Sequence, residues 1–152
     1  MKEIIAYEMA LTGPAEPGGI SCIPFEEKYW DEYMAKYNES FAEMRKSLEV
    51  EPVNFYSSYD QMADKAEDTY LLLKNGEIAG AVSCYGNEVD DLFVAAPFRG
   101  RGLGRKLLLW GVERIREKGF DEVILHVAEW NRGAVKMYSD AGFVIKNREK
   151  VR

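Results

Sequence analysis

The stretch from residue 89 to residue 127 constrains the fold of this chain more than any other part of the sequence. Residues 89–94 have the pattern of a strand, residues 102–118 place apolar side chains at helical spacing, and residues 121–127 form a second strand-like run. Two sequential strands joined by a helix lie parallel, with a right-handed crossover. The sequence therefore predicts an α/β fold around a parallel pair of strands, with Gly119 ending the helix between them.

A hairpin comes before this unit, and a helix and a strand follow it. Residues 69–74 and 77–85 alternate like strands, and Asn75-Gly76 between them suits a two-residue turn because both residues must take positive φ. Residues 131–140 are expected to be helical, and residues 143–146 are expected to form a final strand.

The first 68 residues carry weaker patterns. Residues 3–11 and 20–23 are expected to form strands on either side of a loop rich in Gly and Pro. Apolar residues then recur every three or four positions, which predicts a helix: Phe25, Tyr29, Tyr33, Tyr37, Phe41, Met44 and Leu48. A capping box at Ser40-Phe41-Ala42-Glu43 is expected to divide this helix. A second box at Ser58-Tyr59-Asp60-Gln61 predicts a short helix that runs to about residue 67.

The bulk properties are those of one globular domain. The chain has 152 residues, 47% of them hydrophobic, and no repeat or linker, so residues 1–152 are expected to form a single domain. The absence of a long apolar run and of a secretory signal predicts a cytoplasmic protein that does not bind membranes. Cys22 and Cys84 are expected to be reduced, buried thiols. The net charge of −6 disfavours nucleic acid as a partner and favours a cationic one.

The most informative motif is the glycine-rich run that joins the strand at 89–94 to the following helix. Residues 99–104 are Arg-Gly-Arg-Gly-Leu-Gly. Glycines at a helix start let several backbone N–H groups converge on an anion such as a pyrophosphate. The spacing departs from the Gly-x-Gly-x-x-Gly of a dinucleotide-binding fold, and the Lys-Ser/Thr pair of a P-loop is absent. A solvated basic helix start is the alternative interpretation of this run.

This run, Arg99 to Gly104, resembles the Arg/Gln-x-x-Gly-x-Gly/Ala signature of the GNAT acyltransferase superfamily. Leu92-Phe93-Val94 matches the strand that precedes the loop in that family. Further matches follow in the family's order: Leu125, Val127, Asn131, Ala134, Tyr138, Gly142 and Phe143. The resemblance covers about residues 69–143, roughly half of the chain. It implies an N-acetyltransferase that moves the acetyl group of acetyl-CoA to a primary amine.

The resemblance also implies where the coenzyme lies. It implies a mixed, splayed central sheet flanked by helices on both faces, with the pantetheine arm between residues 89–94 and 121–127. It implies a bulge near Val94, where a backbone N–H stabilises the oxyanion. No metal is implied. The residues implied to contact the coenzyme are Leu92, Phe93, Val94, Arg99, Gly100, Arg101, Gly102, Leu103, Gly104, Arg105, Asn131 and Tyr138.

Two features depart from the family pattern. The proline common two residues after the strand's valine is Ala96 here, with Pro97 one place later. The chain also ends soon after the strand at 143–146, which leaves little room for the family's last strand. We therefore expect residues 3–11 to complete the sheet edge, supplied by the same chain or by the partner in a homodimer. The basic residues 146–152 are interpreted as a solvated tail.

Tyr138 is the candidate general acid. By the resemblance its position matches a tyrosine that faces the coenzyme sulfur, where it can protonate the departing thiolate. The alternative is a core tyrosine that packs its helix against neighbouring side chains. Asn131 is expected to cap the same helix and, by the resemblance, to bond the pantetheine.

Glu88 and Asp90 are the candidate general bases, ranked equally. A primary amine has a pKa near about 10, so a base or a water relay must remove a proton before attack. With Asp91 these carboxylates stand at the head of the strand, where like charges raise a carboxyl pKa. Strand alternation predicts that Glu88 and Asp90 share a face with Leu92 and Val94. A solvated acidic strand end is the alternative.

The acceptor site is expected to be acidic and lined by aromatic residues, which suits a cationic amine. The candidate lining residues are Glu129 and Trp130, at the end of the strand at 121–127, and, by the resemblance, Trp30, Tyr56 and Tyr59. His126, the single histidine, is expected to face away from Leu125 and Val127 and is assigned no role. The leading hypothesis is direct attack in a ternary complex. A non-catalytic sensor or interaction module that binds coenzyme A is the alternative.

Overall fold

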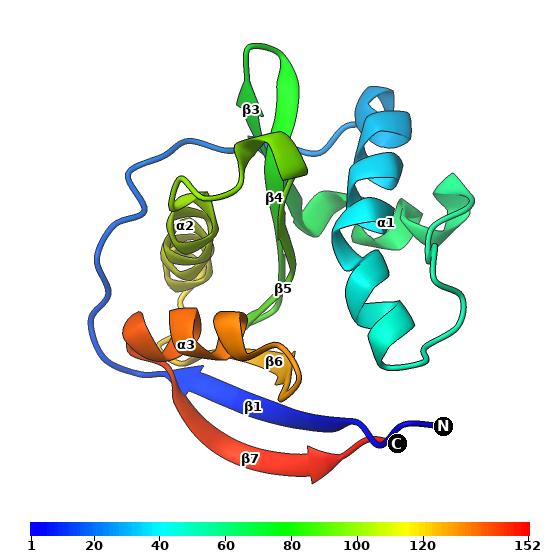
Figure 1. Ribbon diagram of the computed structural model, residues 1–152. Helices are drawn as coiled ribbons and strands as arrows, with labels where there is room; N and C mark the ends of the chain where they lie inside the picture. Colours follow the sequence, from blue (N-terminus) through cyan, green and yellow to red (C-terminus); the bar gives the residue numbers. More distant parts are fainter.

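A mixed sheet of seven strands runs through the computed structural model, which describes residues 1–152 (Figure 1). In chain order the strands are β1 (Ile5–Leu11), β2 (Ile23–Pro24), β3 (Thr69–Lys74), β4 (Glu77–Tyr85), β5 (Glu88–Val94), β6 (Val123–Ala128) and β7 (Val144–Lys150). In space their order is β2-β3-β4-β5-β6-β1-β7. The helices are α1 (Trp30–Ser47), α2 (Leu103–Glu117) and α3 (Arg132–Asp140), and 3-10 turns cover Glu27–Tyr29, Tyr59–Gln61, Ala63–Asp68 and Ala96–Phe98.

Helices cover both faces of this sheet, as predicted. The apolar stripe of α2 packs on one face, where Leu107, Leu108 and Val112 join the same buried cluster as Val82 of β4. Helix α3 lies on the same side as α2, next to β6 and β1 (Figure 1). Helix α1 covers the opposite face with an aromatic layer. The α/β class and the mixed, splayed sheet are therefore confirmed.

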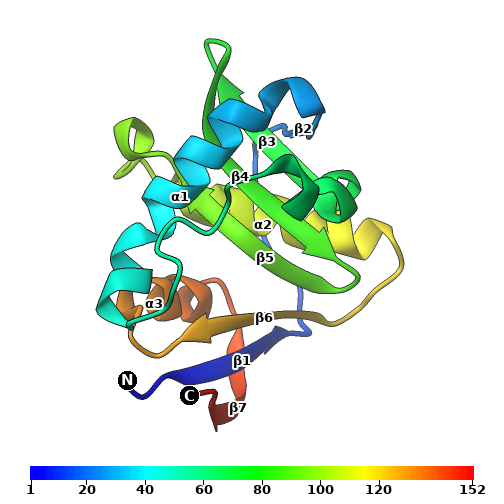
Figure 2. The same cartoon turned by 90° about the vertical axis from the view of Figure 1, so that its right-hand side faces the viewer.

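Strands β5 and β6 form the predicted parallel pair, but they touch at one end only. Glu88 and Ile124 are their single register pair, and the Ile124 N–H donates to the Asn87 carbonyl at 3.0 Å. Beyond that point the two strands diverge (Figure 2). The divergence leaves one edge of β5 without a neighbouring strand, and this opening positions the site described below.

A bulge interrupts the pairing of β4 with β5. Ser83 is opposite Asp90 and Ala81 is opposite Phe93, so Val82 faces two residues, Asp91 and Leu92. Asp91 takes a positive φ of 49°. The bulge expected near Val94 therefore lies two to three residues earlier along the strand.

The extra residue in the bulge corrects the predicted side-chain alternation. Residues two apart on a regular strand share a face, and one inserted residue reverses that pattern downstream. Asp90 and Phe93 thus share the α1 face because their partners Ser83 and Ala81 do. Leu92 and Val94 lie on the opposite, α2 face. The prediction that Asp90 shares a face with Leu92 and Val94 is wrong, and the same reversal separates Glu88 from them.

Strand β1 lies inside the sheet, between β6 and β7. Tyr7 is opposite Val127 of β6 and also opposite Arg148 of β7. The expectation that residues 3–11 complete the sheet is confirmed for this same chain, but their position at the edge is wrong, because β7 is the edge strand. Met9 is fully buried, as an interior strand requires.

The last residues of the chain are not a solvated tail. Residues 144–150 form β7, paired along β1. Beyond it, the Arg152 guanidinium donates hydrogen bonds to the carbonyls of Leu48, Glu49 and Lys2. This side chain therefore satisfies carbonyl groups at the C-terminal end of α1, which would otherwise be unpaired.

Of three short turn and cap motifs elsewhere in the chain, two form as predicted and one does not. The hairpin turn is confirmed, with φ of 54° at Asn75 and 77° at Gly76. The capping box at Ser58 is also confirmed, although it opens 3-10 turns and not an α-helix. The predicted break at Ser40 is wrong: α1 is continuous, and the Ser40 hydroxyl accepts a hydrogen bond from Arg99 Nη2 at 3.2 Å.

Candidate functional site

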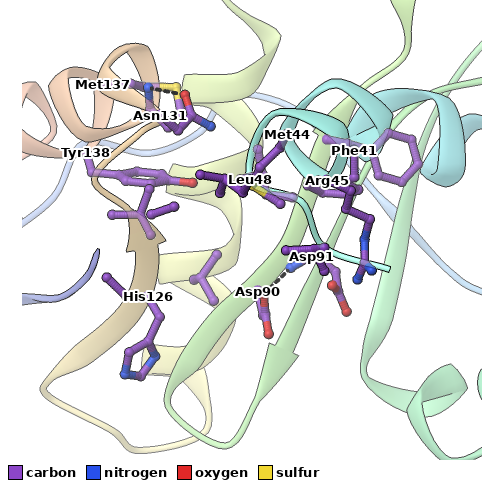
Figure 3. A pocket seen from close by; sticks show the side chains of 18 of the residues that line it. Phe41, Met44, Arg45, Leu48, Asp90, Asp91, His126, Asn131, Met137 and Tyr138 are labelled. Atoms are coloured by element: carbon purple, nitrogen blue, oxygen red, sulfur yellow. Dashed lines mark hydrogen bonds between the residues drawn. The ribbon is translucent and has the colours of Figure 1, made fainter. Parts of the chain in front are cut away.

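A cavity of about 460 Å³ lies where β5 and β6 diverge (Figure 3). Its walls come from five parts of the chain. From β5, β6 and α3 they are Val89, Asp90, Asp91, Leu92, Phe93, Val94, His126, Val127, Ala128, Asn131, Ala134, Met137 and Tyr138. From α1 and the segments near it they are Tyr37, Phe41, Met44, Arg45, Leu48 and Val50, and from the N-terminal segment and β1 they are Ile4 and Ala6.

The glycine-rich run presents a set of free backbone donors at the start of α2. None of the six N–H groups of residues 100–105 donates a hydrogen bond within the protein, and no side chain caps α2. Gly100 and Gly102 have φ of 80° and 76°, which glycine adopts without strain. The positive end of the helix dipole adds to these donors. This amide cradle, residues 100–105, is suited to bind a diphosphate.

The arginines around the cradle have different neighbours. Arg99 donates from Nε to the Val94 carbonyl at 2.9 Å and from Nη2 to Ser40, so it braces the loop against β5 and α1. The Arg101 guanidinium lies over the Phe98 ring. Arg105 approaches only the exposed carboxylate of Glu16, at 3.7 Å. The backbone amides, more than these side chains, are therefore preorganised for an anion.

Gly104 connects the cradle to the cavity. A Cβ atom placed there would meet Met137 Sδ at 3.4 Å and Val94 Cγ2 at 3.8 Å. Both of these residues line the cavity. An elongated ligand can therefore lie with an anionic group on the cradle and its far end in the gap between β5 and β6.

Tyr138 points its hydroxyl into this cavity (Figure 3). Its ring lies against Phe143, with 6.3 Å between centroids, and the hydroxyl makes no hydrogen bond within the protein. Burial, reinforced by the charge of Asp90, raises the pKa of Tyr138 to about 12. The hydroxyl therefore keeps its proton at neutral pH and is available as a donor.

Asn131 caps α3, as predicted. Its Oδ1 accepts a hydrogen bond from the Ala134 N–H at 3.2 Å. The residue also lines the cavity. Its amide group therefore stands on the same wall as Tyr138.

Asp90 is a carboxylate of the cavity that lacks a side-chain partner. Its Oδ1 accepts only the N–H of Asp91, at 2.7 Å. Asp90 as a whole is exposed to solvent. Its carboxyl group nevertheless has protein on enough sides to lose part of its hydration, and the charged Asp91 lies beside it. Partial burial and this neighbouring charge raise the pKa of Asp90 to about 6.

Asp91, which the sequence did not single out, is held between two tyrosines. Tyr37 donates to its Oδ1 at 2.9 Å and Tyr85 donates to its Oδ2 at 2.7 Å. Both carboxylate oxygens are thus occupied, and the positive φ of the bulge is fixed by side chains from α1 and β4. Burial raises the pKa of both tyrosines, and Asp91 raises it further.

His126, which was assigned no role from sequence, lies between two carboxylates at the mouth of the cavity. Its Nδ1 lies 3.0 Å from Glu88 Oε2, and its Nε2 lies 3.4 Å from Glu8 Oε2. Burial by itself lowers the pKa of His126, but the hydrogen bond and charge of Glu88 outweigh it, so the net direction is upward. The predicted orientation, on the face opposite Leu125 and Val127, is confirmed: His126 is exposed, whereas those two residues are buried.

The residues expected at the acceptor mouth lie elsewhere. Tyr56 is 2% exposed and packs edge-on against Trp30, within the aromatic layer between α1 and the sheet. Tyr59 belongs to the same layer. Glu129 accepts a hydrogen bond from Tyr7 outside the main cavity, and Trp130 does not line it. Their placement at the acceptor mouth is wrong, because Trp30, Tyr56 and Tyr59 pack on one another in the aromatic layer and none of the five lines the cavity.

No group of three or more His, Cys, Asp or Glu side chains is arranged to hold a metal ion. None of the helices combines the length and apolar character needed to span a bilayer.

The sequence matches the model of the Acetyltransferase (GNAT) family over residues 25–143. Mycothiol acetyltransferase of Corynebacterium aurimucosum is 50% identical over 58 residues, which are 38% of this chain and 19% of that protein. The chain therefore spans about a fifth of the length of this curated relative.

Solved structures have the same fold. A GNAT-family protein from Novosphingobium aromaticivorans superposes with a TM-score of 0.72 at 19% identity, over 97% of this chain and 62% of that chain. Arabidopsis thaliana Naa50, in complex with the bisubstrate analogue CoA-Ac-MVNAL, superposes with a TM-score of 0.59 at 28% identity, over 84% of each chain.

Proposed function

Because this chain belongs to the GNAT family of acetyltransferases, we propose that it transfers the acetyl group of acetyl-CoA to a primary amine by direct attack in a ternary complex. The observation that carries the proposal is the amide cradle. Six unpaired N–H groups at the head of α2 lie next to a cavity large enough for the pantetheine arm. The CoA-containing analogue bound by Naa50 supports the same choice of coenzyme.

The open edge of β5 supplies the oxyanion donor. The Ala95 N–H donates to Ala79 of β4 at 2.8 Å. Successive N–H groups along a strand point to opposite sides, so that of Val94 points away from β4 into the gap. A thioester carbonyl placed there receives this hydrogen bond as negative charge develops on its oxygen.

Tyr138 is the proposed general acid. The amine nitrogen forms a bond to the thioester carbon, the carbon–sulfur bond breaks, and the tyrosine hydroxyl gives its proton to the departing thiolate. Burial raises the pKa of Tyr138 to about 12, so the hydroxyl is protonated throughout the neutral range and can donate to the thiolate as it forms. General acid catalysis of this kind contributes about 10²- to 10⁴-fold to rate.

Asp90 is the proposed general base. Of the two carboxylates first considered, Glu88 is engaged with His126, whereas Asp90 has no side-chain partner and lines the cavity. A pKa of about 6 leaves Asp90 ionised at neutral pH and able to take a proton from the incoming ammonium group. Glu88 is assigned the task of holding the His126 imidazole at the mouth.

The experiment that tests the proposal is thiol release from acetyl-CoA with a panel of amines, for wild type and Tyr138→Phe. We expect a fall in kcat of about 100-fold or more, with acetyl-CoA affinity changed about twofold or less. Tyr29→Phe is the matched control, because its hydroxyl has no partner and lies outside the cavity. Unchanged turnover in Tyr138→Phe contradicts the general-acid assignment. Coenzyme A binding without any thiol release supports the alternative, a non-catalytic sensor.

A further inference from the structure

The cavity wall that faces Tyr138 and Asn131 is apolar. It is formed by Phe41 and Met44 of α1, by Leu48 just after this helix, and by Val50 and Ile4. In Figure 3 the side chains of Met44 and Leu48 lie across the cavity from Tyr138. The part of an acceptor that enters beside α1 is thus surrounded by hydrocarbon, which favours an apolar group there.

The same cavity offers one carboxylate for one ammonium group. Asp91 has both oxygens occupied by the hydroxyls of Tyr37 and Tyr85. Asp90 has no partner beyond the backbone N–H of its neighbour. A second ammonium on the acceptor finds no free carboxylate beside the apolar wall and loses hydration without compensation.

The one guanidinium in the lining of the cavity is held by residues that do not line it. Arg45 is the one arginine or lysine of its lining. Its guanidinium donates to the Pro52 carbonyl at 3.0 Å and lies 4.8 Å from the centre of the Phe55 ring. His126, the other basic group, lies between Glu88 and Glu8. An acceptor with a carboxylate beside its nitrogen would meet the charge of Asp90, while the Arg45 guanidinium is held at Pro52 and Phe55.

From these three features we infer that the acceptor is a primary monoamine with an apolar body and no carboxylate next to the amine. This inference rests on the proposed acetyl transfer and narrows its substrate class. The same chemistry occurs in a free alkylamine or arylalkylamine and at the N-terminus of a peptide whose first side chain is apolar. The α1 wall, Asp90 and the engagement of Arg45 outside the cavity act on both in the same way.

The test compares matched pairs of acceptors by kcat/KM for thiol release. Leucinamide is set against leucine, hexylamine against 1,6-diaminohexane, and a peptide that begins Met-Leu against one that begins Asp-Leu. We expect the first member of each pair to be preferred about tenfold or more, because like charges or unpaired ions are costly in such a site. Whether the amine pairs or the peptide pair give the higher values identifies the source of the acceptor.

A charge placed on the apolar wall provides a second test. Met44→Asp supplies a second carboxylate in the cavity, so we expect the preference for hexylamine over 1,6-diaminohexane to be reversed. Met34→Asp is the control, because Met34 is also half-buried on α1 but does not line the cavity. It is expected to retain the wild-type preference, and thermal unfolding of both variants checks that they are folded.

The outcomes separate this inference from the proposed function. Turnover that favours leucine or the diamine, or no turnover of any panel member while acetyl-CoA binds, overturns the monoamine class and leaves coenzyme binding in place. No uptake of acetyl-CoA overturns the proposed function and this inference together. Preference for the apolar monoamines, reversed only by Met44→Asp, supports it.

Discussion

The Nδ1 atom of His126 lies 3.0 Å from the carboxylate of Glu88, across the two strands that diverge to form the cavity. The contact sits just beyond the single paired position of β5 and β6. It therefore links the strands at the point where their backbone pairing ends. It also fixes the imidazole at the mouth of the cavity, and Glu8 of β1 approaches it from the other side.

The first prediction concerns the titration of this histidine. Glu88 raises the pKa of His126 above its ordinary value of 6.5, so Glu88→Gln should lower it. Because His126 is the single histidine, its imidazole signals in NMR spectra recorded against pH report this value directly. Glu122→Gln, an exposed change on the segment before β6, is the control and should leave the titration unchanged.

The same pair makes a signed prediction for stability. A histidine with a raised pKa stabilises the folded state fully below its unfolded pKa, and this contribution is lost as pH rises through the folded pKa. Glu88→Gln should therefore cost more stability at about pH 5.5 than at about pH 8.5 in urea unfolding. Equal losses at the two pH values would show that the ion pair does not form.

The third prediction concerns Asp90. Its pKa is raised from 3.8 to about 6, so the folded state holds a proton that the unfolded state releases. Wild-type stability should therefore fall as pH rises through that window, and Asp90→Asn should remove the fall. Urea unfolding should show Asp90→Asn more stable than wild type at about pH 7.5 and equal to it at about pH 4. Asp121→Asn is the exposed control and should show no such gain.

Asp90→Asn should gain stability but lose activity. If Asp90 is the base, wild-type turnover declines as pH falls through about 6, and Asp90→Asn loses turnover at neutral pH. A variant that is more stable but less active is the expected signature of a functional carboxylate placed in an unfavourable environment. Full activity in Asp90→Asn would transfer the base role elsewhere.

The parts of the site that could be predicted from sequence depend on local chemistry. The turns at Gly100 and Gly102 need positive φ, and the start of a helix leaves N–H groups unpaired wherever it occurs. Asn131 caps its helix through a side chain three residues from its partner. Such features are encoded within a few residues, so a short motif contains all that determines them.

The parts that could not be predicted depend on partners distant in sequence. One extra residue at Asp91 reverses the faces of β5, and only the pairing with β4 reveals it. Glu88 and His126 are 38 residues apart and meet because the sheet brings their strands together. Tyr56 is buried and Trp30 is half-buried because their rings pack together in the aromatic layer, which their own spacing does not specify.

The next prediction separates two effects of a Gly→Ala change: disturbance of the amide donors in the cradle, and backbone strain at a positive φ. Gly102 and Gly19 have φ of 76° and 73°, and a Cβ atom at either would meet nothing within 4 Å. Each Gly→Ala change should therefore cost about 1 kcal/mol of stability. Only Gly102→Ala disturbs the amide donors, so it alone should weaken coenzyme A binding, by about tenfold or more. Equal affinities in the two variants would place the diphosphate elsewhere.

The last of these predictions tests the tyrosines that hold Asp91. Tyr85→Phe leaves one oxygen of a half-buried carboxylate without its hydroxyl donor, which should cost about 1–3 kcal/mol in urea unfolding. Because Asp91 sits in the bulge beside Asp90, kcat should also fall. Tyr59→Phe removes a hydroxyl that makes no hydrogen bond and should be close to neutral in both measurements. A neutral Tyr85→Phe would show that this bond does not fix the bulge.

Calorimetric titration with coenzyme A and with pantetheine tests the cradle most directly, since pantetheine has the thiol arm but no diphosphate. If the N–H groups of residues 100–105 hold the diphosphate, coenzyme A should bind saturably at one site and pantetheine should bind far more weakly. Absence of heat with coenzyme A, or equal affinity for the two compounds, would contradict the assignment.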